Sequence, residues 1–179
     1  MMSRIFKLII ILTIIPLISG NYAFTLKNED SSASASSSDC DKMPEINRQI
    51  VSYVSGTIGK KVDRGECWDL AAEALYSVNA KWDGQYRFGR EVDPQKECIY
   101  SGDIVQFKGV HLTYMEDGMQ FEEIMSHHTA IIYKTPSQKE FVLAHQNIAA
   151  TGRKVGLTDF KLADITKGKI EVFRPTPTK

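Results

Sequence analysis

The chain has 179 residues, of which 42% are hydrophobic and 25% are charged, the proportions of a globular protein rather than a disordered polymer. Its 22 Lys and Arg residues balance its 22 Asp and Glu residues. A net charge of zero supplies no field that would attract a polyanion, so we expect no nucleic-acid partner. The length suits a single domain.

The first 23 residues have the pattern of a secretory signal peptide. Arg4 and Lys7 precede an apolar run from Leu8 to Ile18, which is shorter than the roughly 20 residues that cross a bilayer as a helix. We therefore expect a secreted or periplasmic protein without a stable membrane span after signal cleavage. Residues 24–42 are rich in Ser and Ala and are predicted to be a flexible linker, because they bury too little apolar surface to fold.

The folded domain is expected at residues 43–175, followed by a tail at 176–179, and it opens with two predicted helices. From Pro44, which suits a first helical turn, apolar residues recur at helical spacing until Gly56. Asp63 can cap the second helix, and Glu66 three residues later completes a pair like a capping box. Cys67 then lies in the first turn. The apolar stripe of this helix consists of Trp68, Ala71, Ala72 and Leu75.

The second half of the domain is predicted to be a β-sheet. A loop at 81–94 carries Trp82, Tyr86 and Phe88, which either line a cleft or belong to the core. Asp117-Gly118 is typical of a hairpin turn, and residues 158–165 are predicted to form a short helix. Further strands are predicted at 104–107, 128–133, 140–145 and 169–173. Helices followed by strands indicate an α+β fold, with N-terminal helices packed on an antiparallel sheet.

Three cysteines in an exported chain cannot all pair with one another. Cys67 is the one expected to be free, because the N–H groups and the dipole at a helix start favour a thiolate. Cys40 and Cys98 could then form a disulfide that fastens the linker to the loop before the first strand. A lone cysteine is also often a small buried apolar residue, so its position alone leaves both roles open.

Two histidines are candidates for the base that a thiolate nucleophile needs. His128 begins one predicted strand and His145 ends the next, so antiparallel pairing of these strands would bring both rings to one edge of the sheet. The start of the helix that carries Cys67 could pack there. His127 faces the other side of the pleat from His128, so only one of the two can be the base. Alternatively, each histidine is an ordinary, partly buried strand residue.

Four short blocks, in the same order along the chain, carry a family resemblance. They are Gly65 to Ala71, Gly102 to Phe107, His128 to Ile132, and Ala144 to Asn147. Together they resemble the papain-like cysteine amidases and peptidases of the CHAP and NlpC type. The resemblance implies a papain-like fold with Cys67 as nucleophile, His128 as base and His145 as the residue that orients the base. Asn147 is the rival for the orienting role, and no cofactor or metal is implied.

The implied reaction is hydrolysis of an amide bond through a thioester. A Cys67 thiolate paired with a His128 imidazolium attacks the carbonyl, and His128 protonates the leaving amine. Export and the habits of the resembled families predict a peptide or peptidoglycan substrate. The sequence does not reveal an inhibitor or immunity protein.

Two other functions remain open. One is a catalytically inactive binding module on the same fold, since the Cys67 to Ala71 and His127 to Ala130 runs also resemble a fungal cytoskeletal-adaptor domain of papain-like fold. The other is a zinc site formed by Cys67, His128 and His145, because sulfur and imidazole nitrogen suit that metal.

Overall fold

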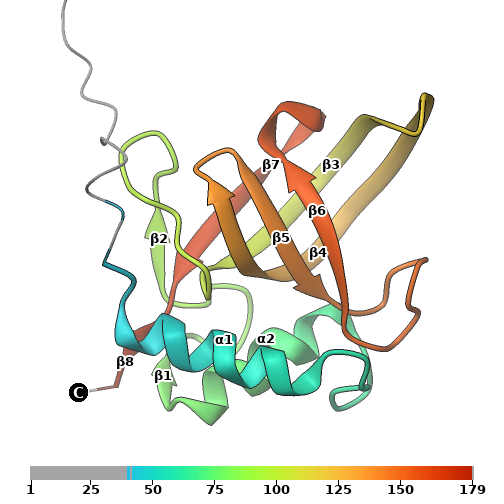
Figure 1. Cartoon of the computed structure of the whole chain (residues 1–179). Helices are drawn as coiled ribbons and strands as arrows, with labels where there is room; N and C mark the ends of the chain where they lie inside the picture. Colours follow the sequence, from blue (N-terminus) through green and yellow to red (C-terminus); the bar gives the residue numbers. More distant parts are fainter. Residues whose placement is uncertain (1–39, 41, 179) are drawn as a thin grey trace, which may run out of the picture. The chain divides into compact units, whose positions relative to one another are not determined.

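Two α-helices precede a β-sheet along the chain (Figure 1). The computed structural model describes residue 40 and residues 42–178. Helix α1 spans Glu45–Thr57 and helix α2 spans Cys67–Ser77. Neither these nor any other helix in the described ranges is long and apolar enough to cross a membrane. The predicted signal peptide and most of the predicted linker lie outside the described residues.

The main sheet has six strands in the order β2-β7-β3-β4-β5-β6, and every neighbouring pair is antiparallel. The strands are β2 (Arg90–Val92), β3 (Ile104–Glu116), β4 (Met119–Ser137), β5 (Glu140–His145), β6 (Gly156–Lys161) and β7 (Ile165–Arg174). Separately, β1 (Ala80–Lys81) pairs with β8 (Thr176–Pro177). β8 lies in the segment predicted to be the tail. The predicted α+β class, with N-terminal helices and an antiparallel sheet, is confirmed.

A hydrophobic cluster packs on each face of the sheet. Successive strand residues point to opposite faces, so Ile131 joins the cluster that contains α1 and α2, whereas Ala130 and Ile132 join the other. Ile50 and Leu75 contribute from the helices to the first cluster and are fully buried. The sheet is therefore covered on one face by helices and packs its own aromatic and aliphatic side chains on the other.

The predicted start of the second helix was wrong. The N-cap of α2 is Glu66, which forms a capping box with Asp69, and Cys67 is the first helical residue. Asp63 lies in the preceding turn with a φ of 48°, a left-handed conformation that does not suit a helix cap. Cys67 therefore lies at the N-terminal end of α2, where backbone N–H groups have no partner within the helix.

The predicted helix at 158–165 was also wrong. Residues 156–161 form β6, which pairs with β5 along its whole length, and only the 3-10 helix η2 (Leu162–Asp164) is helical. Thr158 and Phe160 alternate with exposed residues in this strand. Pairing with the edge of β5 supplies hydrogen bonds that a short isolated helix could not replace.

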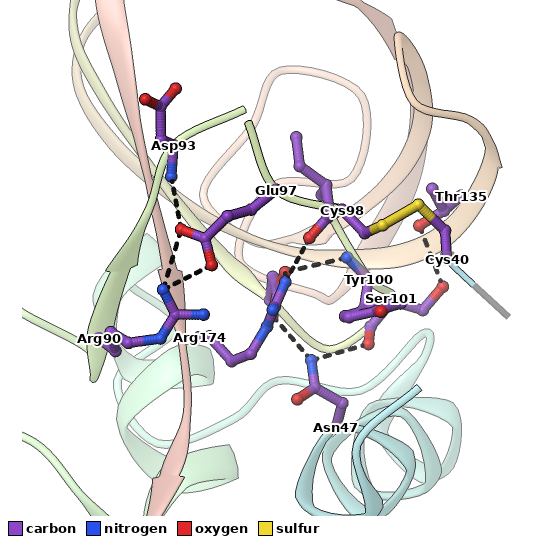
Figure 2. A network of polar contacts seen from close by, with 12 residues as sticks. Cys40, Asn47, Arg90, Asp93, Glu97, Cys98, Tyr100, Ser101, Thr135 and Arg174 are labelled. Atoms are coloured by element: carbon purple, nitrogen blue, oxygen red, sulfur yellow. Dashed lines mark hydrogen bonds and ion pairs between the residues drawn. A yellow bond between two sulfur atoms is a disulfide. The ribbon is translucent and has the colours of Figure 1, made fainter. Parts of the chain in front are cut away.

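A buried polar network holds α1 against the sheet and lies close to a disulfide (Figure 2). Cys40 and Cys98 are joined, which settles the pairing that the sequence left open. Arg174 of β7 forms an ion pair with Asp103 at 2.8 Å and also donates to the Cys98 carbonyl. Asn47 of α1 donates to the same Asp103 carboxylate at 2.8 Å. The N-terminal helix, the turn before β3 and the last long strand thus meet at one carboxylate.

Gly102 allows that turn to approach α1 closely. Its φ is 86°, and a Cβ atom at this position would lie 2.5 Å from the backbone oxygen of Asn47. Only glycine fits both constraints. The Gly102 to Phe107 block therefore has a structural role in joining the helices to the sheet.

Replacing Arg174 by Met is expected to lower the free energy of unfolding by about 3 kcal/mol, because the fully buried Asp103 carboxylate would lose its cation. Arg48→Met is the matched control, since it removes the cation of an exposed pair with Glu45 and should cost less than about 1 kcal/mol. Urea unfolding followed by circular dichroism measures both values. Similar losses in the two variants would contradict a special role for the buried network.

Candidate active site

Cys67 is a free, partly buried cysteine at the N-terminus of α2. Burial raises the pKa of its thiol, and hydrogen bonds from the backbone of Thr129 and Trp68 counteract that rise only in part. The expected lowering of this pKa by the helix start is therefore not seen. Desolvation outweighs the favourable backbone groups, so Cys67 is a neutral thiol near pH 7.

The side chains of His128, His145 and Thr158 form a hydrogen-bonded relay across three neighbouring strands, β4, β5 and β6. Nε2 of His128 lies 2.9 Å from Nδ1 of His145. Nε2 of His145 lies 2.9 Å from the Thr158 hydroxyl. The relay leaves Nδ1 as the ring nitrogen of His128 without a hydrogen bond among the described residues, and so identifies the atom that can act as a base.

Burial keeps both rings neutral. The His128 side chain is 9% exposed and that of His145 is 1% exposed. Desolvation lowers the pKa of His128 to about 4. Desolvation, with a smaller contribution from the nearby His128, lowers the pKa of His145 to about 3. At neutral pH the pair therefore consists of two uncharged imidazoles that share one proton between their facing nitrogens.

Gln146 docks the start of α2 beside the end of β5. Its side chain is fully buried and donates to the carbonyls of Glu66 at 2.9 Å and Val62 at 3.0 Å. On the β4 side, the backbone of Thr129, the residue after His128, hydrogen-bonds to the Cys67 sulfur. The sulfur thus lies at the backbone of β4 next to His128.

Cys67 and His128 do not share a hydrogen bond within residues 42–178. The ring of His128 lies 6.1 Å from that of Phe107, between centroids, on the sheet face opposite the helices. A reaction between the sulfur and Nδ1 of His128 would require these two atoms to come within hydrogen-bond reach. Hydrogen bonds of catalytic groups commonly tighten only when substrate is bound.

Asn147 and His127 lie near the relay but do not contact it. The Asn147 side chain donates to the Glu66 carboxylate at 2.8 Å. His127 is exposed and packs edge-on against Tyr86, with ring centroids 4.5 Å apart. Of the two candidates for the orienting role, the structure brings His145 to the His128 ring and holds Asn147 at the helix cap.

The aromatic loop before β2 contributes one exposed ring beside these residues. Phe88 is fully buried in the core, and Trp82 packs partly buried against the same cluster. The Trp68 indole N–H donates to the Gln85 carbonyl at 2.5 Å, which fastens the loop to α2. Tyr86 is 44% exposed and is the loop aromatic that faces solvent beside His127.

Sequence reasoning missed Thr158 and Gln146. Thr158 was assigned to a helix, and only its place in a strand next to β5 brings its hydroxyl to His145. The alternation of Thr158 and Phe160 with exposed residues is the signal that could have identified the strand. Gln146 follows His145 directly, but its docking role depends on contacts with residues 80 and 84 positions away in the chain.

The zinc alternative has no ligand set in the part of the chain that the structure describes. No three His, Cys, Asp or Glu side chains there converge on one point as a metal ion requires. His128 and His145 instead use their facing nitrogens to bond to each other.

The free energy of unfolding is expected to fall as the pH falls below about 6.5. Both histidines have a lower pKa in the folded protein than in the unfolded chain, so the unfolded chain binds more protons in this range. Each ring contributes up to about 1.4 kcal/mol per pH unit. The free energy of unfolding is measured with urea at pH 7, 6 and 5. Its fall with pH should be less steep in His145→Gln than in the wild-type protein, and as steep as in the wild type in the exposed control His127→Gln. Equal slopes in both variants would argue against buried, neutral rings.

Alkylation of Cys67 by iodoacetamide is expected to be slower than that of glutathione at pH 7, because burial raises the pKa of the thiol. The rate should increase steadily as the pH rises through 9. Mass spectrometry of samples quenched over time gives the rate at each pH. A fast rate that is constant from about pH 5 to 7 would reveal a preformed thiolate–imidazolium pair instead.

Comparison with known proteins assigns the fold. Residues 42–179 match the model of a family described as the AIM3/BBC1 cysteine proteinase-fold domain. No curated protein gives a significant match. Similar solved structures include the crystal structure of Ly7917 and that of Ly7917 with the hydrolyzing product of MDP, each at 12% identity and a TM-score of 0.47. They cover 73% and 72% of this chain, which in turn spans 62% of theirs.

The family match covers most of the chain and agrees with the α+β architecture and the helix-borne cysteine. It supports the cysteine proteinase fold that the four sequence blocks predicted. It does not identify the CHAP or NlpC type within that fold. The chain belongs to the AIM3/BBC1 cysteine proteinase-fold domain family.

Proposed function

We propose that this chain is a cysteine-dependent amidase or peptidase that hydrolyses an amide bond through a thioester. Cys67 is the nucleophile, His128 the base, and His145 the residue that orients the base. The observation that carries the proposal is the relay of His128, His145 and Thr158. It comes together with a free cysteine at a helix start, whose pKa is influenced by the backbone of Thr129, the residue after His128. A nucleophile, a base and a group that orients the base are the parts that this chemistry requires.

Thr158 and His145 set the tautomer of His128. When the Thr158 hydroxyl accepts a hydrogen bond from the Nε2–H group of His145, Nδ1 of His145 accepts a hydrogen bond from the Nε2–H group of His128. Nδ1 of His128 then keeps its lone pair. Because burial lowers the pKa of His128 to about 4, this nitrogen is unprotonated at neutral pH. It is therefore the base that can take the thiol proton.

The reaction starts from a neutral pair rather than from the ion pair predicted by the sequence. As the Cys67 sulfur attacks the amide carbonyl, Nδ1 of His128 takes its proton, and the resulting imidazolium donates that proton to the leaving amine. Water then attacks the thioester, with His128 as base, and releases the acid and the thiol. The Cys67 backbone N–H, at the start of α2, is placed to donate to the oxyanion.

Export and a cell-wall peptide substrate are further parts of the proposal. The basic residues and apolar run at the N-terminus support export. The Cys40–Cys98 disulfide supports it as well, because such bonds persist in oxidising compartments. The substrate class rests on the similarity of the four sequence blocks to CHAP and NlpC enzymes, so peptidoglycan stem and cross-link peptides are the first to test.

The second candidate function is a binding module without activity on the same fold. Two observations favour it: burial raises the pKa of the Cys67 thiol, and the sulfur has no hydrogen bond to His128 among the described residues. In this case the relay and the capping box stabilise the domain and do not react.

Turnover of peptides by matched variants separates the two functions. The full chain is incubated with wall fragments and a peptide panel, and products are identified by mass spectrometry. Cys67→Ala and His128→Ala should each lower kcat by at least about a thousandfold, as loss of a catalytic group does. Thr158→Val should lower kcat about tenfold to a hundredfold, because it removes the hydroxyl that sets the tautomer, and Asn147→Ala should change it less than tenfold. Absence of Cys67-dependent products from the wild-type protein would favour the binding module.

A further inference from the structure

The hairpin of β3 and β4 projects beyond the rest of the sheet (Figure 1). β7 pairs with β3 only as far as Leu112, and β5 pairs with β4 only from Ile131 onward. Among the described residues, β3 is thus the only strand paired with residues 119–126 of β4. Such an edge offers backbone N–H and C=O groups to a strand from another chain.

This projecting hairpin carries an unusual share of exposed apolar side chains. They are Met115, Met119, Phe121 and Ile124, which make up half of the eight exposed large hydrophobic residues in the described chain. The most exposed of them are Met115 at 65% and Ile124 at 64%. Single exposed apolar residues are common on protein surfaces, but a group of them on one edge marks an interaction site.

The charge of the hairpin indicates the kind of partner. Glu116, Asp117, Glu122 and Glu123 lie on it, and no Lys or Arg occurs from Gly109 to Tyr133. Glu123 is partly buried without an ion-pair partner among the described residues, and burial raises the pKa of its carboxyl. Two acids on the free edge, with two more at the tip of the hairpin, repel a second copy of the same edge, whereas they attract a cationic strand.

Both faces of the edge have the same mixed character. On one face, Phe121 and Glu123 follow one another, and on the other, Glu122 and Ile124 do so, since successive strand residues alternate in direction. A complementary strand therefore needs a basic and an apolar residue on each of its faces. This pattern is met by two basic residues followed by two apolar ones, repeated along the strand.

We propose that residues 119–126 of β4 bind an extended segment of a partner protein that is rich in Lys or Arg and in apolar residues, and that this segment adds as a strand to the sheet. Backbone hydrogen bonds along the edge supply affinity. The acidic residues select basic partners, and Phe121 and Ile124 contact the apolar ones. The inference does not depend on the proposed hydrolase activity.

A labelled peptide, Lys-Lys-Val-Val-Lys-Lys-Val-Val, tests the proposal by fluorescence anisotropy with the full chain carrying Cys67→Ala, so that cleavage plays no part. We expect saturable binding of this peptide and at least tenfold weaker binding of the peptide with Glu in place of Lys. Methylation of backbone nitrogens blocks strand addition. Two peptides are compared, one methylated at the odd-numbered residues and the other at the even-numbered residues. Only one set of N–H groups faces the edge of β4, so one peptide should bind at least tenfold more weakly and the other should retain binding.

Charge-reversal variants locate the site on the protein. Glu122→Lys with Glu123→Lys should weaken binding of the Lys peptide at least tenfold. The control, Glu91→Lys with Asp159→Lys, makes the same change in net charge on exposed positions of β2 and β6 and should leave binding within about twofold. Ile124→Ser should weaken binding severalfold, and its far-ultraviolet circular dichroism should match that of the parent chain.

Three outcomes would overturn the proposal. The first is equal binding by both charge-reversal variants, which would indicate diffuse electrostatic attraction. The second is equal binding of all methylated peptides, which would rule out strand addition. The third is concentration-dependent dimerisation through this edge, seen by analytical ultracentrifugation, without binding of the Lys peptide, which would identify a second copy as the occupant.

Discussion

Antiparallel pairing between β4 and β5 determines where the proposed functional groups lie. Ile131 pairs with Ala144, which brings His128 and His145 onto the same face, close enough for their rings to bond at 2.9 Å. β6 then adds to the outer edge of β5 and supplies Thr158. Before Ile131 the two strands separate, and in that region Gln146 docks the start of α2. The site and the free edge of β4 thus have a common origin, the point at which β4 and β5 cease to pair.

Desolvation sets the electrostatic state of the site. The N-terminus of α2 and nearby backbone N–H groups favour a thiolate at Cys67, yet burial raises the pKa of that thiol. The same effect keeps His128 and His145 uncharged. A buried site with no permanent charge costs less to fold than one holding an ion pair. The proposed reaction would therefore create charge only as it proceeds, so it would depend on the hydrogen-bonded tautomer of His128 rather than on a resting ion pair.

The cysteine proteinase fold does not by itself establish catalysis. A free cysteine, a bonded histidine pair and a shared fold are compatible with an enzyme and with a binding module. The proposed hydrolysis and the proposed strand addition can coexist in this chain, because the acidic edge of β4 and the histidine relay use different parts of the same strand.

The sequence by itself determined the local features of this protein. Periodicity and turn residues predicted both helices, the Asp117-Gly118 hairpin turn and the strand at 140–145, and the order of four blocks indicated the cysteine proteinase fold. These features depend on residues close together in the chain, whose conformational preferences act over a few positions.

Only the tertiary structure decided the rest. Thr158 was placed in a helix because residues 158–165 have a weak local pattern, and pairing with β5 overrode it. The pKa direction of Cys67 was misjudged because the sequence shows the favourable helix start but not the burial that opposes it. The choice between His145 and Asn147 beside His128 depended on strand register and on a backbone turn with a φ of 62° at Asn147. Each of these outcomes depends on contacts between distant segments, whose energies no local pattern contains.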